Sequence, residues 1–161
     1  MTLSIRRARS DEAGVIYSLI CELAEYEKLS HEVEATETMI ADALFGENAR
    51  LFCDIAEWNG EVAGFAVWFI NFSTFSGRSG IYLEDLFVRP ALRGKGLGKA
   101  LLSHLAKECV TQGWSRLQWS VLDWNTPSIE FYKSLGAVMM DEWTTCKVAG
   151  PALSALAEGR R

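Results

Sequence analysis

Residues that commonly bind metals are scarce in this sequence. Its 161 residues include only two histidines, His31 and His104, which lie far apart. The four cysteines stand singly within apolar segments, without the C-x-x-C spacing of zinc sites and redox motifs. We therefore expect no metal site, and we expect free cysteines that behave as small hydrophobic residues. They are Cys21, Cys53, Cys109 and Cys146.

Long apolar runs and an excess of basic residues are also missing. No stretch reaches the roughly 18 uncharged residues that a membrane-spanning helix requires, and residues 1–7 lack the apolar core of a secretory signal. The formal net charge is −5, whereas a nucleic-acid-binding domain carries a basic face. These absences predict a cytoplasmic protein that binds neither membrane nor nucleic acid. The acidic balance is compatible with a cationic substrate.

The length and the apolar share limit the architecture. Of the 161 residues 49% are apolar, which is enough to bury the core of one domain, while two domains would be cramped. No internal repeat, low-complexity stretch or linker interrupts the chain. We expect a single domain over residues 1–161.

Apolar residues recur with strand and helix periods in turn along the chain. Asn59-Gly60 joins two strand-like runs and is a strong signal for a tight hairpin. Thr126-Pro127 and Gly136 mark the start and the end of a late helix. Strands are predicted at 3–8, 51–58, 61–70, 81–89 and 116–122, with a last strand or hairpin arm within 137–148. Helices are predicted from the cap Ser10-Asp11 to Tyr26, from Thr36 or Glu37 to Phe45, and over 97–113 and 126–136, with a loop at 71–80. This mixture predicts an α/β fold.

The most informative segment is Arg93-Gly94-Lys95-Gly96-Leu97-Gly98. It follows a strand-like run and begins a helical pattern, so its glycines allow close backbone approach where free N–H groups at a helix start bind phosphate. A Walker A loop would need glycine and serine or threonine where the chain has Arg93 and Ala100. A dinucleotide fingerprint would need glycine in place of Lys99. The segment therefore predicts a pyrophosphate loop of another kind.

A second motif is Asn125-Thr-Pro-Ser-Ile-Glu-Phe-Tyr-Lys-Ser-Leu-Gly136. With Arg-Gly-x-Gly-x-Gly, it resembles the GNAT acyltransferases, and the predicted order of elements is similar over nearly the whole chain. Within that superfamily, the segments 25–28, 82–88 and 124–133 resemble the diamine (spermidine/spermine) and thialysine N-acetyltransferases. The resemblance implies the GNAT fold, in which a mixed, mostly antiparallel central sheet is flanked by helices.

The resemblance also implies that acetyl-CoA is the co-substrate. Its pantetheine arm would pair with the backbone of the strand that precedes the glycine segment, and its pyrophosphate would lie on that segment. A backbone N–H near Phe87 would donate to the thioester oxygen. The residues expected to bind acetyl-CoA are Leu86, Phe87, Val88, Arg93, Gly94, Lys95, Gly96, Leu97, Gly98, Asn125, Ser128, Tyr132 and Lys133.

Acyl transfer to an amine needs a proton acceptor, because an alkyl ammonium is almost fully protonated at pH 7, and it needs a proton donor for the departing thiolate. Glu84 is the candidate acceptor, acting through water, and the alternative is an exposed or salt-bridged strand acid. Tyr132 is the candidate donor on the resemblance, and the alternative is a packing tyrosine.

A cation site for the substrate is predicted from Glu27, Glu84 and Asp85. Adjacent residues of a regular strand point to opposite faces, so Glu84 and Asp85 reach one cleft only if the strand bulges there. The resemblance implies such a bulge, which would bring Asp85 to the substrate ammonium. The alternatives are a structural acid at Asp85 and an exposed helix acid at Glu27.

We expect an enzyme that acetylates the primary amine of a small molecule by direct attack in a ternary complex. The acceptor would be a diamine, a polyamine or a lysine-like amino acid such as thialysine. The segment 71–80 contains no acid and adds Arg78, which favours a short amine with its own carboxylate over a long polycation. The alternatives are a protein N-terminus, a protein lysine or an antibiotic amine as acceptor, or a non-catalytic acyl-CoA-binding module. The subgroup also implies a homodimer.

Overall fold

The computed structural model describes residues 1–160, which fall into two compact units, Met1–Ser120 and a second that begins at Val121. The first unit contains a five-stranded sheet in the order β1-β2-β3-β4-β5. Its strands are β1 (Leu3–Arg7), β2 (Phe52–Trp58), β3 (Glu61–Ser73), β4 (Arg78–Val88) and β5 (Leu117–Trp119). The first four are antiparallel neighbours, and β5 runs parallel to β4. The predicted mixed, mostly antiparallel sheet is confirmed.

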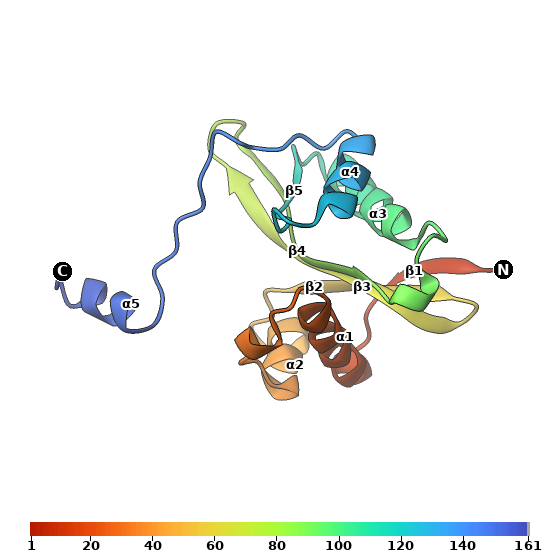
Figure 1. Ribbon diagram of the computed structural model, residues 1–161, viewed down its shortest axis with the longest axis horizontal. Helices are drawn as coiled ribbons and strands as arrows, with labels where there is room; N and C mark the ends of the chain where they lie inside the picture. Colours follow the sequence, from red (N-terminus) through yellow and green to blue (C-terminus); the bar gives the residue numbers. More distant parts are fainter. Residues whose placement is uncertain (161) are drawn as a thin grey trace. The chain divides into compact units, whose positions relative to one another are not determined.

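Helices cover both faces of this sheet. They are α1 (Ala13–Tyr26), α2 (Glu37–Phe45) and α3 (Leu97–Gln112), with short 3-10 turns at Ser10–Glu12, Ser30–Glu32 and Pro90–Leu92. Figure 1 shows α1 and α2 on one face and α3 on the other. The hydroxyl of Thr36 caps α2 by accepting a hydrogen bond from the Met39 N–H at 3.2 Å, in line with the predicted start of that helix.

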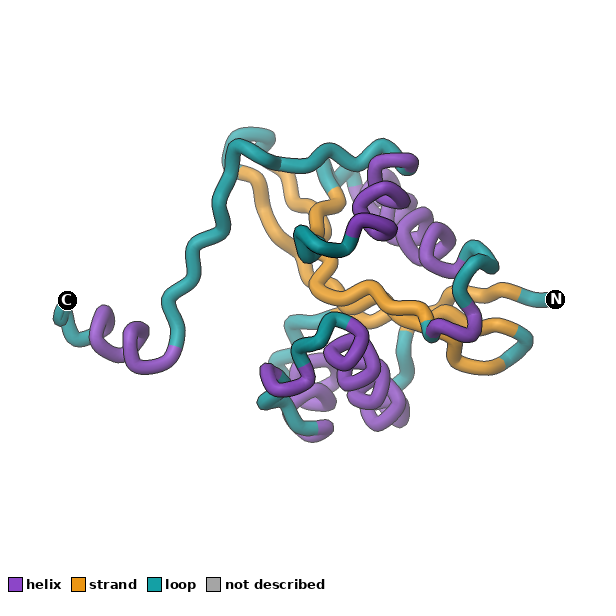
Figure 2. Tube along the Cα trace, in the orientation of Figure 1, coloured by secondary structure: helices purple, strands orange, loops and turns teal. Residues whose placement is uncertain are grey.

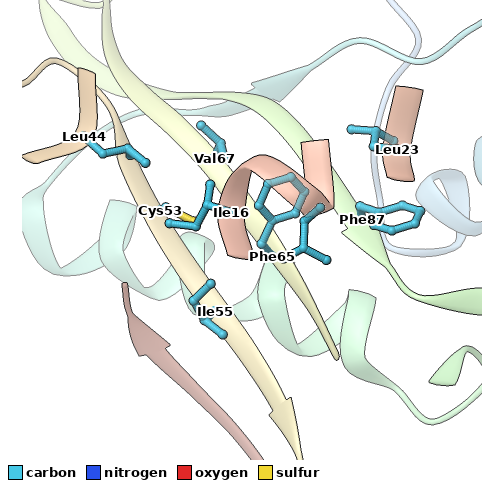
Figure 3. Close-up of a cluster of buried hydrophobic side chains, with 9 residues drawn as sticks. Ile16, Leu23, Leu44, Cys53, Ile55, Phe65, Val67 and Phe87 are labelled. Carbon is cyan, nitrogen blue, oxygen red and sulfur yellow. The ribbon is translucent and has the colours of Figure 1, made fainter. Parts of the chain in front are cut away.

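The main core lies between the α1/α2 layer and the sheet (Figure 3). Alternate strand residues point to the same face, so the pairs Cys53 and Ile55 of β2, and Phe65 and Val67 of β3, meet the helices together. The cluster consists of these four residues with Ile16, Leu19, Leu23, Leu44 and Phe87. Burial of each large side chain contributes about 1.5–3 kcal/mol to stability. Phe87 anchors the end of β4 that leads into the glycine segment.

An ion-pair cluster fixes the start of α1 to β1. The Glu12 carboxylate accepts two hydrogen bonds from the Arg6 guanidinium, at 2.7 and 2.8 Å, and one from the Arg9 N–H at 2.8 Å. Arg6 also pairs with Glu57 of β2. The hydrogen bonds from Arg6 lower the pKa of Glu12 to about 2, although burial opposes the shift.

We expect Glu12→Gln to lower the free energy of unfolding at pH 7 by about 2 kcal/mol, because Arg6 loses one of its two carboxylates. The folded-state pKa lies below the value of an unfolded glutamate, about 4.3. The stabilisation is therefore complete above that value and is lost as the pH falls towards 2. Urea titrations at several pH values should show that the free energies of unfolding of the wild type and Glu12→Gln become equal in acid. Asp11→Asn, at an exposed neighbouring carboxylate, is the matched control, and equal stability of Glu12→Gln and wild type at pH 7 would contradict the assignment.

The β3–β4 hairpin is longer than predicted. Residues 71–73 and 78–80, expected to be loop, pair with each other, and only 74–77 remain as the turn. Gly77, at φ 66°, donates its N–H to the Ser73 carbonyl at 2.8 Å and closes the turn. Ladder hydrogen bonds thus override the local preference of serine and glycine for loops. In contrast, β5 covers only three of the residues predicted for it.

The second unit contains α4 (Thr126–Ser134) and α5 (Gly150–Ala157). Asn125 caps α4 by accepting a hydrogen bond from the Ser128 N–H at 3.3 Å, and Gly136, at φ 93°, follows its end. The prediction of a strand within 137–148 is wrong, because these residues form neither strand nor helix, and Figure 2 shows them as loop. A strand needs a partner, and the described residues of this unit provide none.

Candidate active site

The expected bulge lies in β4 at the two adjacent acids. Asp85 pairs with Val67 and Leu83 pairs with Trp68, so Glu84 is the extra residue opposite β3. At the bulge the two adjacent acids differ in exposure to solvent: Glu84 is exposed, whereas Asp85 is half-buried. The conditional prediction that both acids serve one cleft therefore has the backbone irregularity it requires.

Asp85 lies on the sheet face that α1 and α2 cover. Its partner Val67 belongs to the core on that face, as does Phe87, two residues further along β4. Burial, together with the charges of Glu84 and Glu27, raises the pKa of Asp85 to about 7. Burial also raises the pKa of Glu27, just beyond the end of α1. The structure thus brings the three predicted substrate acids into one electrostatic cluster.

The glycine segment forms a tight turn into α3. Gly94 and Gly96 have φ values of 77° and 82°, in the left-handed region that favours glycine, and Gly96 is the N-cap of the 16-residue helix. Apart from the glycines themselves and the chain next to them, no atom lies within 4 Å of the position that a Cβ would take at either glycine. Residues 93–96 are exposed, so the first N–H groups of α3 and its dipole face an open surface suited to an anion.

Cationic side chains flank this turn. The Arg93 guanidinium lies over the rings of Tyr26, at 4.4 Å, and Phe87, at 5.6 Å, and its Nε donates to the Val88 carbonyl at 3.0 Å. The Lys95 ammonium lies 5.5 Å from the Trp58 ring. Aromatic faces hold both cations beside the helix start. Sequence analysis did not assign this contact to Tyr26, because an aromatic residue near a helix end has many uses.

The edge of β4 next to the bulge is open on one side. β5 pairs only with residues 81–83 of β4, and within residues 1–160 no strand continues the pairing beside 84–88. Backbone groups of Leu86, Phe87 and Val88 on that edge can therefore pair with an extended ligand, as a sheet edge pairs with an added strand.

The remaining predicted residues lie in the second unit. Asn125, Ser128 and Tyr132 are spaced by three and four residues, which places them along one face at the start of α4. Lys133 follows in the last turn of that helix. The Asn125 carbonyl is engaged in the helix cap, so any ligand contact by this residue falls to its NH₂ group.

Polar pairs that the sequence analysis did not identify extend along β4. The Tyr82 hydroxyl lies 2.9 Å from the Ser120 hydroxyl, and the Asn71 amide donates to Gln118 at 3.4 Å. The residues of each pair are distant in sequence, and the pairing of β5 with β4 brings them together. Within residues 1–160 no group of histidine, cysteine or acidic side chains is arranged to hold a metal ion. The described helices include none that is both long and apolar enough to cross a bilayer.

Comparison with known proteins identifies close counterparts. Residues 15–137 match the Acetyltransferase (GNAT) family. Thialysine N-epsilon-acetyltransferase of Mus musculus is 38% identical over 95% of this chain and 96% of its own length. L-ornithine N5-acetyltransferase of Arabidopsis thaliana is 31% identical over 94% of this chain and 86% of its own. An integron cassette protein from the mobile metagenome of V. cholerae has a TM-score of 0.82 at 30% identity, covering 98% of this chain and 99% of that one.

Proposed function

The chain belongs to the GNAT acetyltransferase family and is an enzyme that acetylates small-molecule amines, and we propose that its acceptor is a short amine with its own carboxylate. Thialysine and other lysine-like amino acids have this chemistry. The observation that carries the proposal is the arrangement of β4 within the first unit. This strand holds two of the three acids at its bulge, has an unpaired edge beside it, and leads into the glycine turn after its end.

We propose that acetyl-CoA binds along the open edge of β4 and at the start of α3, and that it supplies the activated acetyl group as a thioester. Leu86, Phe87 and Val88 would bind the pantetheine arm, and residues 93–98 the pyrophosphate. The fit is supported by the two left-handed glycines, the open space beside them and the flanking cations. Asn125, Ser128, Tyr132 and Lys133 are assigned to the same ligand on motif grounds.

We propose direct attack of the amine in a ternary complex. The N–H near Phe87 donates to the thioester oxygen, Tyr132 protonates the departing sulfur, and Glu84 conducts the amine proton to solvent through water. Exposure of the Glu84 side chain supports a role at the solvent end of the proton path.

The carboxylate preference rests on Arg78. Arg78 pairs with Ser73 and Asp85 pairs with Val67, and these two partners lie on the same face of β3, six residues apart. The exposed Arg78 guanidinium and the half-buried Asp85 carboxylate carry the opposite charges with which the two ends of a lysine-like molecule would pair.

We expect kcat/KM to be higher for thialysine, lysine or ornithine than for spermidine or spermine. Arg78→Ala should raise KM for lysine about tenfold, since a charge-assisted hydrogen bond contributes roughly 1.5–3 kcal/mol. The same substitution should leave unchanged the KM for 1,5-diaminopentane, which is lysine without its carboxylate. Arg50→Ala, at an exposed residue before β2, is the control. A higher kcat/KM for spermine, or equal effects of Arg78→Ala on the two amines, would contradict the proposal.

We further propose one domain over residues 1–161, a cytoplasmic location, and a homodimer without nucleic-acid or membrane partners. The family match extends from the first compact unit into the second, which supports one domain. All four cysteines are free, as in reducing compartments. Exposed apolar side chains of the second unit support self-association; they include Val138, Met140, Trp143, Leu153 and Leu156.

A further inference from the structure

We propose that Asp85 is the first acceptor of the proton that the substrate ammonium must lose, and that Glu84 then passes it to solvent. The inference rests on the proposed function and assigns a distinct task to each of the two adjacent acids.

The bulge gives Asp85 the position that this task requires. As the residue opposite Val67, it lies beside the apolar core rather than in solvent, and Phe87 follows it on the same face. Within residues 1–160 its carboxylate takes part in no hydrogen bond or ion pair. A half-buried carboxylate without a partner is costly, and a bound ammonium would supply the missing cation.

The charged and titratable groups around Asp85 are mostly acidic. Glu84 approaches from β4, Glu27 from the end of α1, and the Cys53 thiol from β2. The cation Arg93 lies over the rings of Tyr26 and Phe87 and donates a hydrogen bond to a backbone carbonyl. Burial and the two neighbouring carboxylates raise the pKa of Asp85 to about 7. A general base works best with a pKa near the working pH, so Asp85 is much better matched than an ordinary carboxylate.

The step balances without any further reactant. One N–H bond of the ammonium breaks and an O–H bond forms on Asp85, which leaves a neutral amine. The nitrogen lone pair forms the new C–N bond to the acetyl carbon while the C–S bond breaks. Tyr132 gives its phenolic proton to the departing sulfur, and the second amine proton restores the phenol. Asp85 then releases its proton through water to Glu84 and the solvent, so each turnover liberates one proton.

The test is the pH dependence of kcat/KM for a lysine-like amine. In the wild type we expect kcat/KM to fall as the pH drops below about 7, because protonated Asp85 cannot accept a proton. Glu27→Gln removes a like charge and should move this inflection to lower pH by about 0.5 to 1 unit. Glu25→Gln, at an exposed residue of α1, should leave it in place. An inflection that is absent, or that Glu27→Gln does not move, would overturn the proposal.

Asp85→Asn provides the second arm. We expect kcat/KM near pH 7.5 to fall about a hundredfold. The difference in kcat/KM from the wild type should narrow as the pH approaches the pKa of an alkyl ammonium, about 10.4. Free amine needs no base, whereas a purely structural defect would give the same deficit at every pH and would overturn the proposal. Wild type that binds acetyl-CoA but acetylates no small amine at any pH would instead refute the proposed function.

Discussion

Gly96→Asp will weaken acetyl-CoA binding by about a hundredfold, equivalent to ~3 kcal/mol. Gly96 has a φ of 82° at the N-cap of α3, and the space beside it is open, as a ligand site requires. Aspartate would place a negative charge where the pyrophosphate lies and would oppose the helix dipole's attraction for the anion. Isothermal titration calorimetry measures the loss directly.

The matched control is Gly60→Asp in the β2–β3 turn. Gly60 has the same φ of 82° and equally open surroundings, so both variants carry the same backbone strain. We expect similar losses of stability in the two, but unchanged acetyl-CoA affinity in Gly60→Asp. Gly96→Asn, which adds volume without charge, should bind with intermediate affinity. If Gly96→Asp binds acetyl-CoA with the affinity of the wild type, the pyrophosphate does not bind at this turn.

Tyr132→Phe will lower kcat about a hundredfold while acetyl-CoA affinity stays near that of the wild type. The change deletes one proton donor and little volume, and loss of a positioned general acid has this usual scale. Initial rates of thiol release, with calorimetry for binding, separate the two effects. Tyr17→Phe, which removes a phenol from α1, should retain full activity. If the Tyr132 variant keeps more than about half of the wild-type rate, the leaving sulfur takes its proton from elsewhere.

Local sequence chemistry predicted the elements that carry the candidate site residues. The Asn59-Gly60 turn, the glycines before α3 and the Thr126-Pro127 helix start each express backbone preferences that operate within a few residues. For that reason the hairpin, the start of α3 and the start of α4 fall where they were predicted. The bulge at Glu84 was expected only through family resemblance, because no local residue pattern specifies it.

Properties that depend on distant segments could not be predicted. The raised pKa of Asp85 results first from its burial and then from the charges of Glu84 and of Glu27 at the end of α1, and strand pairing decided the length of the β3–β4 hairpin. The stretch 137–148 has strand-like composition but lacks a strand to pair with among the described residues of its unit. Composition alone cannot indicate whether a pairing partner is available.

The acetyltransferase activity is tested by incubating the protein with acetyl-CoA and thialysine and following both free thiol and product mass. We expect one acetyl group on the side-chain amine for each thiol released, with slower release when spermine replaces thialysine. Bound acetyl-CoA without thiol release above the rate of spontaneous hydrolysis, for thialysine and for every other small amine offered, would contradict this expectation.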